Sequence, residues 1–135
     1  MPLAKIEVRK SRTAEEVQAL IETHKTNKEV GFGGWCGYWA PDGWADLLYA
    51  LHLLLEFTDP DYKVQQVKEK FGGLCFYVEP GLSEVGKMLI KEAEKLSFTV
   101  CQQCGQPGKL IKPSWWATLC EEHSDPETTT RGYHL

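Results

Sequence analysis

Alternating and helical spacings of apolar residues divide the chain into a small set of elements. Apolar and charged residues alternate over residues 4–9, a period of two that predicts a strand with one buried face. Thr13 begins a capping box, and apolar residues then recur at helical spacing, so an amphipathic helix is predicted over residues 13–25. Asp42 is expected to cap a second helix, which runs to Phe57 and carries a wide apolar face.

The middle of the chain has the pattern of a β-hairpin. Leu74, Phe76 and Val78 recur with a period of two, which predicts a strand over residues 74–79, and the glycine pair before them predicts a turn back to a strand within residues 62–70. Val64 and Val67 have opposite parity in that first strand, so a straight strand would bury only one of them. A bulge at the two glutamines between them is the simplest way to bury both.

Together these patterns predict one α+β domain. Ser83 is expected to cap a third helix, with apolar positions recurring up to Leu96. Strands over residues 4–9, 62–70 and 74–79 would form a small antiparallel sheet covered by the three helices. The expected boundaries are residues 1–98 for the core, 99–123 for a zinc-binding module packed on it and 124–135 for a flexible tail.

Length and composition agree with a single folded domain. The chain has 135 residues, of which 42% are hydrophobic and 11% aromatic, which suffices for one core and is far too apolar for a disordered chain. With 15 Lys and Arg against 19 Asp and Glu, the net charge is −4, so no excess of cations is present to neutralise phosphates. We therefore expect no duplex nucleic acid among the partners.

Three features favour a soluble protein in a reducing compartment, the cytoplasm. Residues 1–10 contain no apolar core of signal-peptide length. The longest apolar run, residues 47–55, is interrupted by His52 and is too short to span a bilayer, so no membrane partner is expected. The five cysteines are an odd number, and three of them have metal-ligand spacing, which fits a disulfide framework poorly. The oligomeric state stays open.

The strongest chemical signal lies near the C-terminus. Cys101 and Cys104 form one pair and Cys120 and His123 another, each with two residues between its members. Two such pairs are typical of a tetrahedral zinc site, in which each short loop presents two ligands. Four protein ligands leave no position for water or substrate, so Zn²⁺ is expected to stabilise the fold rather than to catalyse a reaction.

Neighbouring residues refine this prediction to a zinc ribbon or a treble-clef-like module. Gly105, directly after Cys104, suits the sharp turn of a zinc knuckle. Segments 109–111 and 115–118 are expected to form a small hairpin between the two ligand pairs. The alternative is a redox pair of the thioredoxin type formed by Cys101 and Cys104, which would need no second ligand pair downstream.

The second unusual feature is a stretch rich in glycine and aromatic residues, residues 31–44. Stacked rings on such a loop could hold a base, a nucleotide or an extended peptide. In the alternative interpretation several rings fold over the core, because an exposed patch of five large aromatics is unfavourable in a monomer. The candidate partner- or ligand-binding residues are Trp35, Tyr38, Trp39, Trp44 and Tyr49.

Weaker candidates have an ordinary structural interpretation beside the functional one. Cys36 could act as a nucleophile with His24 or His52, but both histidines also suit hydrogen-bonded positions at the edge of an apolar face. A small basic cluster on the predicted hairpin is more typical of a solvated sheet face, and its members are Lys63, Lys68 and Lys70.

Four motifs carry a resemblance to a known family. They are GWxxLL over residues 43–48, VKEKFGGLxFY over residues 67–77, CxxCGxPG over residues 101–108 and WxTLCxxH over residues 116–123. In these motifs the chain resembles a family of small bacterial and phage or prophage proteins, and the match spans most of residues 43–123. The family often carries Arg where this chain has Cys75, and it implies no established activity.

These observations favour a non-enzymatic, zinc-stabilised binding protein. The resemblance adds the expectation of a phage- or prophage-encoded modulator of a host system, including antiviral defence. The expected partner is a host protein, or a small-molecule or nucleotide ligand. One alternative is a binder of nucleotides or single-stranded nucleic acid that uses the aromatic loop, and another is an enzyme that uses Cys36 or Cys75 as a thiolate.

Overall fold

The structure, a computed structural model, describes residues 12–26, 37–111 and 116–124. In these ranges it contains three α-helices, a short 3-10 turn and two antiparallel strand pairs, so the predicted α+β class is confirmed. The predicted strand over residues 4–9 lies outside the described residues. In chain order the elements are α2 (Ala14–Glu22), η1 (Asp42–Trp44), α3 (Ala45–Thr58), β1 (Val64–Lys70), β2 (Gly73–Val78), α4 (Glu84–Ser97), β3 (Lys109–Ile111) and β4 (Ala117–Leu119).

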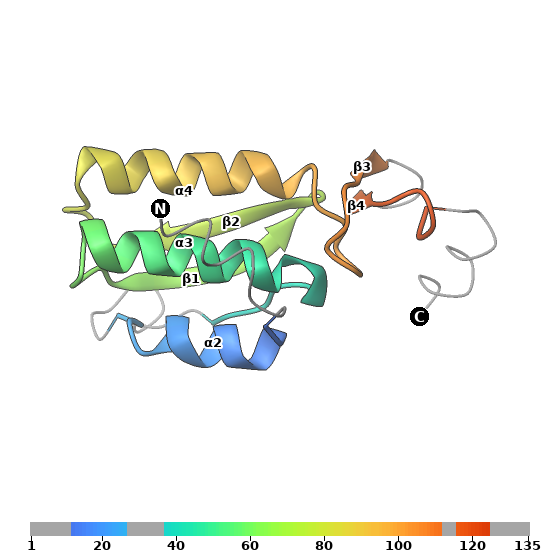
Figure 1. The fold of residues 1–135 in the computed structure, drawn as a ribbon. Coiled ribbons are helices and arrows are strands. Elements are labelled where there is room, and N and C mark those ends of the chain that lie inside the picture. Colours follow the sequence, from blue (N-terminus) through green and yellow to red (C-terminus); the bar gives the residue numbers. More distant parts are fainter. Residues whose placement is uncertain (1–11, 27–36, 112–115, 125–135) are drawn as a thin grey trace.

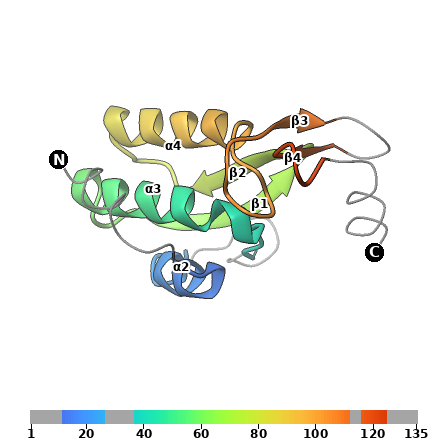
Figure 2. The ribbon, with the colours of Figure 1, turned by 45° about the vertical axis from the view of Figure 1, so that its right-hand side comes forward.

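The helices pack around the β1–β2 hairpin. Helix α4 packs on β2 and against α3, and α2 packs against α3. Figure 1 shows α3 and α4 running along the hairpin, with the β3–β4 pair beyond its turn, and Figure 2 shows the same order from a second side. The core is formed by buried side chains of the helices, of η1 and of the β1–β2 hairpin with the segment before it: Val17, Ile21, Trp44, Ala45, Leu48, Leu51, Leu55, Tyr62, Val64, Val67, Leu74, Phe76, Ile90 and Ala93.

The hairpin has the predicted bulge and a tight turn. The register of β1 against β2 shifts between Val64 and Gln66, and this shift allows both Val64 and Val67 to be buried. Lys70 pairs with Gly73, so the turn consists of Phe71 and Gly72 alone. Their φ angles are 54° and 90°, the left-handed conformation that two-residue hairpins of type I′ require. A non-glycine residue therefore occupies a strained position at the hairpin tip.

The outer edge of β1 is covered by two segments that the apolar pattern did not place there. Residue 25 forms a parallel bridge with Val64, and residue 38 forms another with Val67. The backbone hydrogen bonds run in both directions, for example from the Val64 N–H to the His24 carbonyl at 2.8 Å. Because an uncovered edge strand invites pairing with other chains, these bridges protect β1. They also fix His24 beside the hairpin.

Helix α3 lies at the centre of the helical layer. It begins at Ala45 after the η1 turn and has no side-chain cap, so the prediction that Asp42 caps it is wrong. The physical reason is that Asp42 is itself the first residue of the 3-10 turn, so the position before η1 is occupied by Pro41 and the position before α3 by Trp44. Of the helices in the described ranges, none combines the length and the apolar character needed to cross a bilayer.

Helix α4 depends on a cap that links it to the end of α3. The Ser83 hydroxyl accepts a hydrogen bond from the Gly86 N–H at 3.0 Å and donates to Asp59 at 2.8 Å. We expect Ser83→Ala to lower the free energy of unfolding by about 1 kcal/mol, since the cap and its link are both lost. Urea denaturation followed by circular dichroism measures this change. In the matched control, Lys87→Ala, only an exposed ion pair is removed and the stability should stay within about 0.5 kcal/mol. Equal effects of the two substitutions would contradict the assignment.

Candidate metal centre

The structure brings the four predicted ligands together. One donor atom from each of Cys101, Cys104, Cys120 and His123 lies within 4.8 Å of the others. The Nδ1 atom of His123 is 3.2 Å from the Cys120 sulfur and 3.5 Å from the Cys101 sulfur, and the sulfurs of Cys104 and Cys120 are 3.7 Å apart. These separations are close to the edges of a tetrahedron around a metal with Zn–S bonds of about 2.3 Å. The group can therefore hold a metal ion such as zinc.

Local backbone geometry positions the two ligand pairs. After Cys101 the chain turns back, with the Gly105 N–H bonded to the Cys101 carbonyl at 2.9 Å and Gly105 at a φ of 81°. This positive φ confirms the sharp turn predicted for the glycine. The predicted hairpin is also confirmed, because β3 and β4 pair antiparallel and carry the chain to Cys120. The Ser124 N–H bonds to the Cys120 carbonyl at 2.9 Å, which forms the turn that contains His123.

The thiols lie in an environment that stabilises one negative charge without a metal. Burial tends to raise the pKa of Cys101, but hydrogen bonds from the amides of residues 120, 104 and 103 outweigh it and lower the pKa to about 7. Burial and the neighbouring sulfurs raise the pKa of Cys104 to about 11. Several thiolates in one cluster repel each other, and a bound cation would remove that repulsion. The donor set thus fits a dication, and its three cysteines form no disulfide in the structure.

The segment that carries the four candidate ligands is joined to the core through tight backbone contacts. We call it the metal module; the structure describes its residues 99–111 and 116–123. The Gly43 N–H bonds to the Gln102 carbonyl at 2.8 Å, and the Trp44 indole N–H bonds to the Val100 carbonyl at 3.0 Å. A Cβ atom on Gly43 would lie 2.0 Å from the Cys101 carbonyl oxygen, so only glycine fits there. On the other side, the Thr118 hydroxyl donates to the Gly72 carbonyl at the hairpin tip at 2.7 Å. The ligand loops are therefore held against both η1 and the hairpin.

The predicted aromatic candidates do not form one exposed surface in the described ranges. Trp44 is 0% exposed and belongs to the core, so it cannot contact a partner in this conformation. Tyr38 and Tyr49 are partly buried and pack against the core, and burial raises the pKa of Tyr38. Trp39 is 59% exposed, and Trp35 lies outside the described residues. The alternative interpretation, in which rings of this stretch fold over the core, holds for Trp44.

The two histidines and the cysteine candidates are placed as follows. His24 and His52 are both buried and hydrogen-bonded, as their structural interpretation predicts. Burial lowers the pKa of His52, Glu56 opposes this shift, and His24 adds to it.

Cys36 lies outside the described residues. Cys75 is half-buried on the face of β2 that is turned away from the core, next to the exposed Tyr77.

A different pair of exposed rings lies where the hairpin meets the metal module, and a third exposed ring, Tyr77, lies further along β2. Phe71 is 62% exposed and Trp116 43% exposed, and their ring centroids are 5.5 Å apart. Lys70 lies 5.8 Å from the Phe71 ring, and Lys68 lies 5.8 Å from the Tyr77 ring. Composition drew attention to residues 31–44 and missed this set. The signal that could have found it is a phenylalanine next to the predicted turn. We call these five residues the hairpin-tip face: Lys68, Lys70, Phe71, Tyr77 and Trp116.

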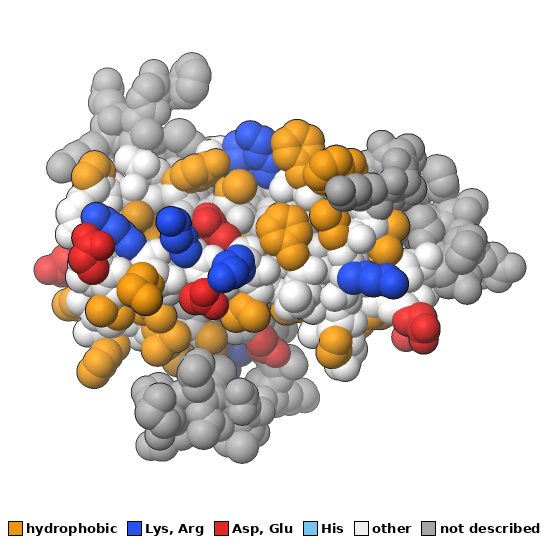
Figure 3. Space-filling view, turned by 90° about the horizontal axis from the view of Figure 1, so that it is seen from above, with side chains coloured by type: hydrophobic (Ala, Val, Ile, Leu, Met, Phe, Trp, Pro, Cys, Tyr) orange, Lys and Arg blue, Asp and Glu red, His pale blue; other side chains and the backbone are white. Residues whose placement is uncertain are grey.

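Within the described ranges, no other two exposed aromatic rings contact each other. Val85, Met88 and Leu96 are exposed on α4. On the side seen in Figure 3, hydrophobic side chains are interspersed with lysines, arginines and acidic residues. This mixture is normal for a solvated helix, because a large share of any protein surface is apolar. The α4 surface therefore carries no separate argument for binding.

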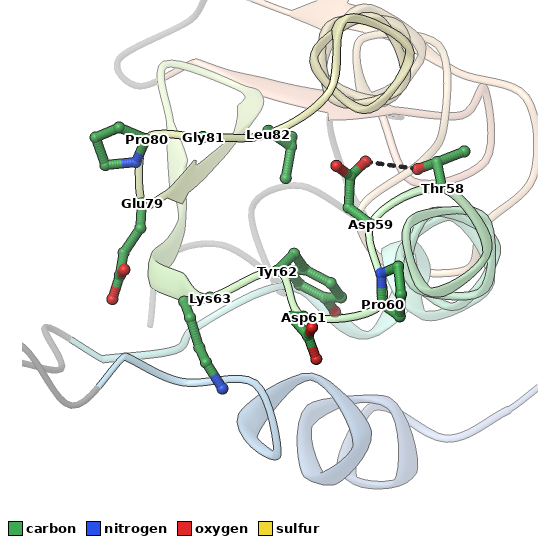
Figure 4. Close-up of a pocket in the computed structure, with 10 residues that line it drawn as sticks. All are labelled: Thr58, Asp59, Pro60, Asp61, Tyr62, Lys63, Glu79, Pro80, Gly81 and Leu82. Atoms are coloured by element: carbon green, nitrogen blue, oxygen red, sulfur yellow. Dashed lines mark hydrogen bonds between the residues drawn. The ribbon is translucent and has the colours of Figure 1, made fainter.

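A pocket of about 300 Å³ lies at the other end of the hairpin, between residues 58–63 and 79–82 (Figure 4). Its carboxylate at Asp59 accepts hydrogen bonds from Thr58 at 2.7 Å and from both the amide and the hydroxyl of Ser83. Burial tends to raise the pKa of Asp59, but these bonds outweigh it and lower the pKa below its usual value. Thr26 donates to Glu79, a second carboxylate of the wall. Both acidic groups thus stabilise the fold.

Comparison with known proteins gives no match to set beside this geometry: no family model, no curated protein and no solved structure is similar to the chain at a significant level. The resemblance of the motifs to bacterial and phage proteins therefore stays an expectation.

Proposed function

We propose that the protein is a non-enzymatic binding protein whose C-terminal module is stabilised by one zinc ion. Thiolates and imidazole are the ligands that zinc prefers, and the four donors come from Cys101, Cys104, Cys120 and His123. With four protein ligands the ion has no position for substrate, which supports a structural role. The knuckle and the β3–β4 hairpin support a module of the zinc-ribbon or treble-clef kind.

The hairpin-tip face is the surface that we assign to partner binding. The observation that carries this assignment is the exposed pair of Phe71 and Trp116, one from the hairpin and one from the metal module. Phe71 adopts a φ of 54°, a conformation that costs a non-glycine residue on the order of 1 kcal/mol and for which Asn is better suited. An exposed ring held at such a position is best explained by a contact with another molecule, and aromatic anchors are typical of interfaces.

The proposed partner is a host protein. This choice rests on the net charge of −4 and on the resemblance of the motifs to phage and prophage proteins, many of which are expected to act on host systems. A second candidate is single-stranded nucleic acid, favoured by the two lysines beside the exposed rings. Bases stack on aromatic side chains, and nearby Lys residues neutralise phosphates.

The substitution Phe71→Asn tests the proposal without harming the fold. Asn followed by Gly is the preferred pair for a type I′ turn, so stability should be kept or raised while the ring is lost. We expect capture of the partner from host lysate, measured by quantitative mass spectrometry, to fall at least about tenfold. Confirmation requires the same loss with the purified partner. Trp39→Ala, an exposed ring outside the hairpin-tip face, is the matched control and should bind normally.

The same two variants separate the candidate ligands. A fluorescein-labelled oligothymidylate should show no change in anisotropy with the wild-type chain if the partner is a protein. Binding that is lost in Phe71→Asn and weakens steeply with salt would instead assign the face to single-stranded nucleic acid. A partner that binds both variants as well as the wild type would contradict the assignment of this face.

A further inference from the structure

A second cluster of metal-ligating side chains lies at the edge of the core, away from the cysteines: its two histidines are buried and its glutamate is exposed. His52 and Glu56 are four residues apart on α3 and so lie on one face of the helix. His24 follows α2 and is held beside them because the segment after the helix is bonded to β1. One donor atom from each of the three lies within 4.8 Å of the others. His24 is 28 positions from His52 and 32 positions from Glu56 in the sequence.

The two rings direct the same kind of nitrogen at the carboxylate. Nε2 of His24 is 3.0 Å from one Glu56 oxygen, and Nε2 of His52 is 3.5 Å from the other. The opposite nitrogens both contact Tyr62: Nδ1 of His24 lies 2.9 Å from its carbonyl oxygen, and Nδ1 of His52 lies 2.8 Å from its hydroxyl. Tyr62 is buried and its ring stacks on His24 at 4.0 Å, so it holds both contacts in place.

These contacts determine which nitrogen can bind a cation. A carbonyl oxygen only accepts hydrogen bonds, so Nδ1 of His24 carries the proton and the lone pair of the neutral ring is on Nε2. The Tyr62 hydroxyl can accept a hydrogen bond from the Nδ1–H of His52, and the lone pair of the His52 ring is then on Nε2 as well. Metal-binding histidines typically donate their remote N–H to a carbonyl or another oxygen in this way.

We propose that His24, His52 and Glu56 bind a divalent transition-metal ion of the zinc class, through both Nε2 atoms and the Glu56 carboxylate. Metal–ligand bonds of about 2.0–2.1 Å at a tetrahedral ion place its ligands about 3.3 Å apart. The observed separations of 3.0 and 3.5 Å lie on either side of that value. Two imidazoles and one carboxylate form a donor set that zinc, manganese, iron and cobalt all accept.

This site differs in kind from the cysteine cluster. Three protein ligands leave at least one coordination position for water, whereas the cysteine cluster supplies all four. The two rings are nearly inaccessible, and the Glu56 side chain is 45% exposed, so the ion would enter and exchange water on the side of Glu56. The proposal is independent of the assigned binding face.

Metal counting with the full untagged chain tests the proposal. The protein is equilibrated with excess Zn²⁺, desalted and analysed by mass spectrometry for metal and for chain. We expect two ions per wild-type chain and one per Glu56→Gln chain. Calorimetric titration should show that Glu56→Gln lowers the affinity of the second site for Zn²⁺ more than about tenfold. Loss of a residue that only hydrogen-bonds to a metal ligand already lowers metal affinity about 10- to 100-fold, and Glu56 would be a direct ligand. Tyr62→Phe should lower the Zn²⁺ affinity of this site by about 10- to 100-fold, because the His52 ring loses its hydrogen bond to the Tyr62 hydroxyl.

Two control variants make the outcome unambiguous. Glu92→Gln removes an exposed carboxylate from α4 and should keep both ions. Cys104→Ser should lose the cysteine-bound ion and keep the other, so that failure of the zinc module is distinguished from failure of the second site. One ion per wild-type chain, or a second ion that survives Glu56→Gln unchanged, would overturn the proposal. In the first case a proton between His24 and Glu56 takes the place of the metal.

Discussion

Removal of the metal from the cysteine cluster is expected to unfold the β3–β4 module while α3, α4 and the β1–β2 hairpin keep their structure. Zinc bound by four protein ligands contributes on the order of 10 kcal/mol to the folding of small modules. The module's own buried cluster is small, since it consists of Ala117, Leu119 and two of the cysteines. A chelator at equilibrium, or Cys104→Ser, should therefore abolish its dispersed amide resonances in a ¹H–¹⁵N spectrum.

The matched control for this prediction is Cys75→Ser. Cys75 is a free, half-buried thiol on the hairpin, and the metal cluster of the module does not include it. Substitution by cobalt provides a direct measurement, because charge transfer from thiolate to Co²⁺ gives an intense near-ultraviolet band. We expect this band in the wild-type chain and in Cys75→Ser, and a strong loss in Cys104→Ser. If the module stayed folded in the chelated protein, its fold would not depend on a metal, and the prediction would be wrong.

The cluster of candidate metal ligands could be predicted from the sequence because its residues lie at short, regular spacings. Two residues between the members of each pair leave few possible loop conformations, and Gly105 marks the turn. The bulge in β1 could be predicted for a similar reason, because the parity of Val64 and Val67 is a local property. In both cases the spacing of residues in the sequence is enough to predict the local arrangement, and the structure adds the distances.

The edge of β1 and the histidine cluster could not be predicted in this way. Alternation tells which face of a strand is buried, but not which segment lies alongside it. His24 reaches His52 only because residue 25 pairs with Val64, a contact between segments far apart in the chain. Helix α2 also ends at Glu22, so His24 does not continue its apolar face as the helical spacing suggested. Tertiary pairing decided the position of this residue.

The aromatic stretch shows why composition alone misplaces a binding surface. Rings concentrated between residues 31 and 44 indicate an unusual segment, yet exposure is decided by packing. Trp44, the last residue of η1, is fully buried, whereas Phe71, in the hairpin turn, is exposed. Trp39 and Trp44 therefore provide a comparison between an exposed ring and a buried ring of the same type, five positions apart in the sequence.

Trp44→Ala is expected to lower the free energy of unfolding by about 3–5 kcal/mol, a large part of the total stability of a domain of this size. The ring is fully buried, so its removal leaves a cavity between α3 and the junction with the metal module. The Val100 carbonyl also loses the indole N–H that donates to it at 3.0 Å, and the loss of this partly buried hydrogen bond adds to the cost. Urea denaturation followed by circular dichroism at a wavelength insensitive to tryptophan measures the change.

Two further variants separate the contributions of the Trp44 ring. Trp44→Phe keeps most of the apolar volume but loses the indole N–H, so its destabilisation should be smaller than that of Trp44→Ala. Trp39→Ala removes a ring that is 59% exposed and should change stability by no more than about 0.5 kcal/mol. If Trp39→Ala destabilised the protein as much as Trp44→Ala, both rings would have to belong to the core, and the difference in their burial would be wrong. If Trp44→Ala unfolded at the wild-type urea concentration, the ring would be free to leave its site, and a direct contact of Trp44 with a partner would become possible again.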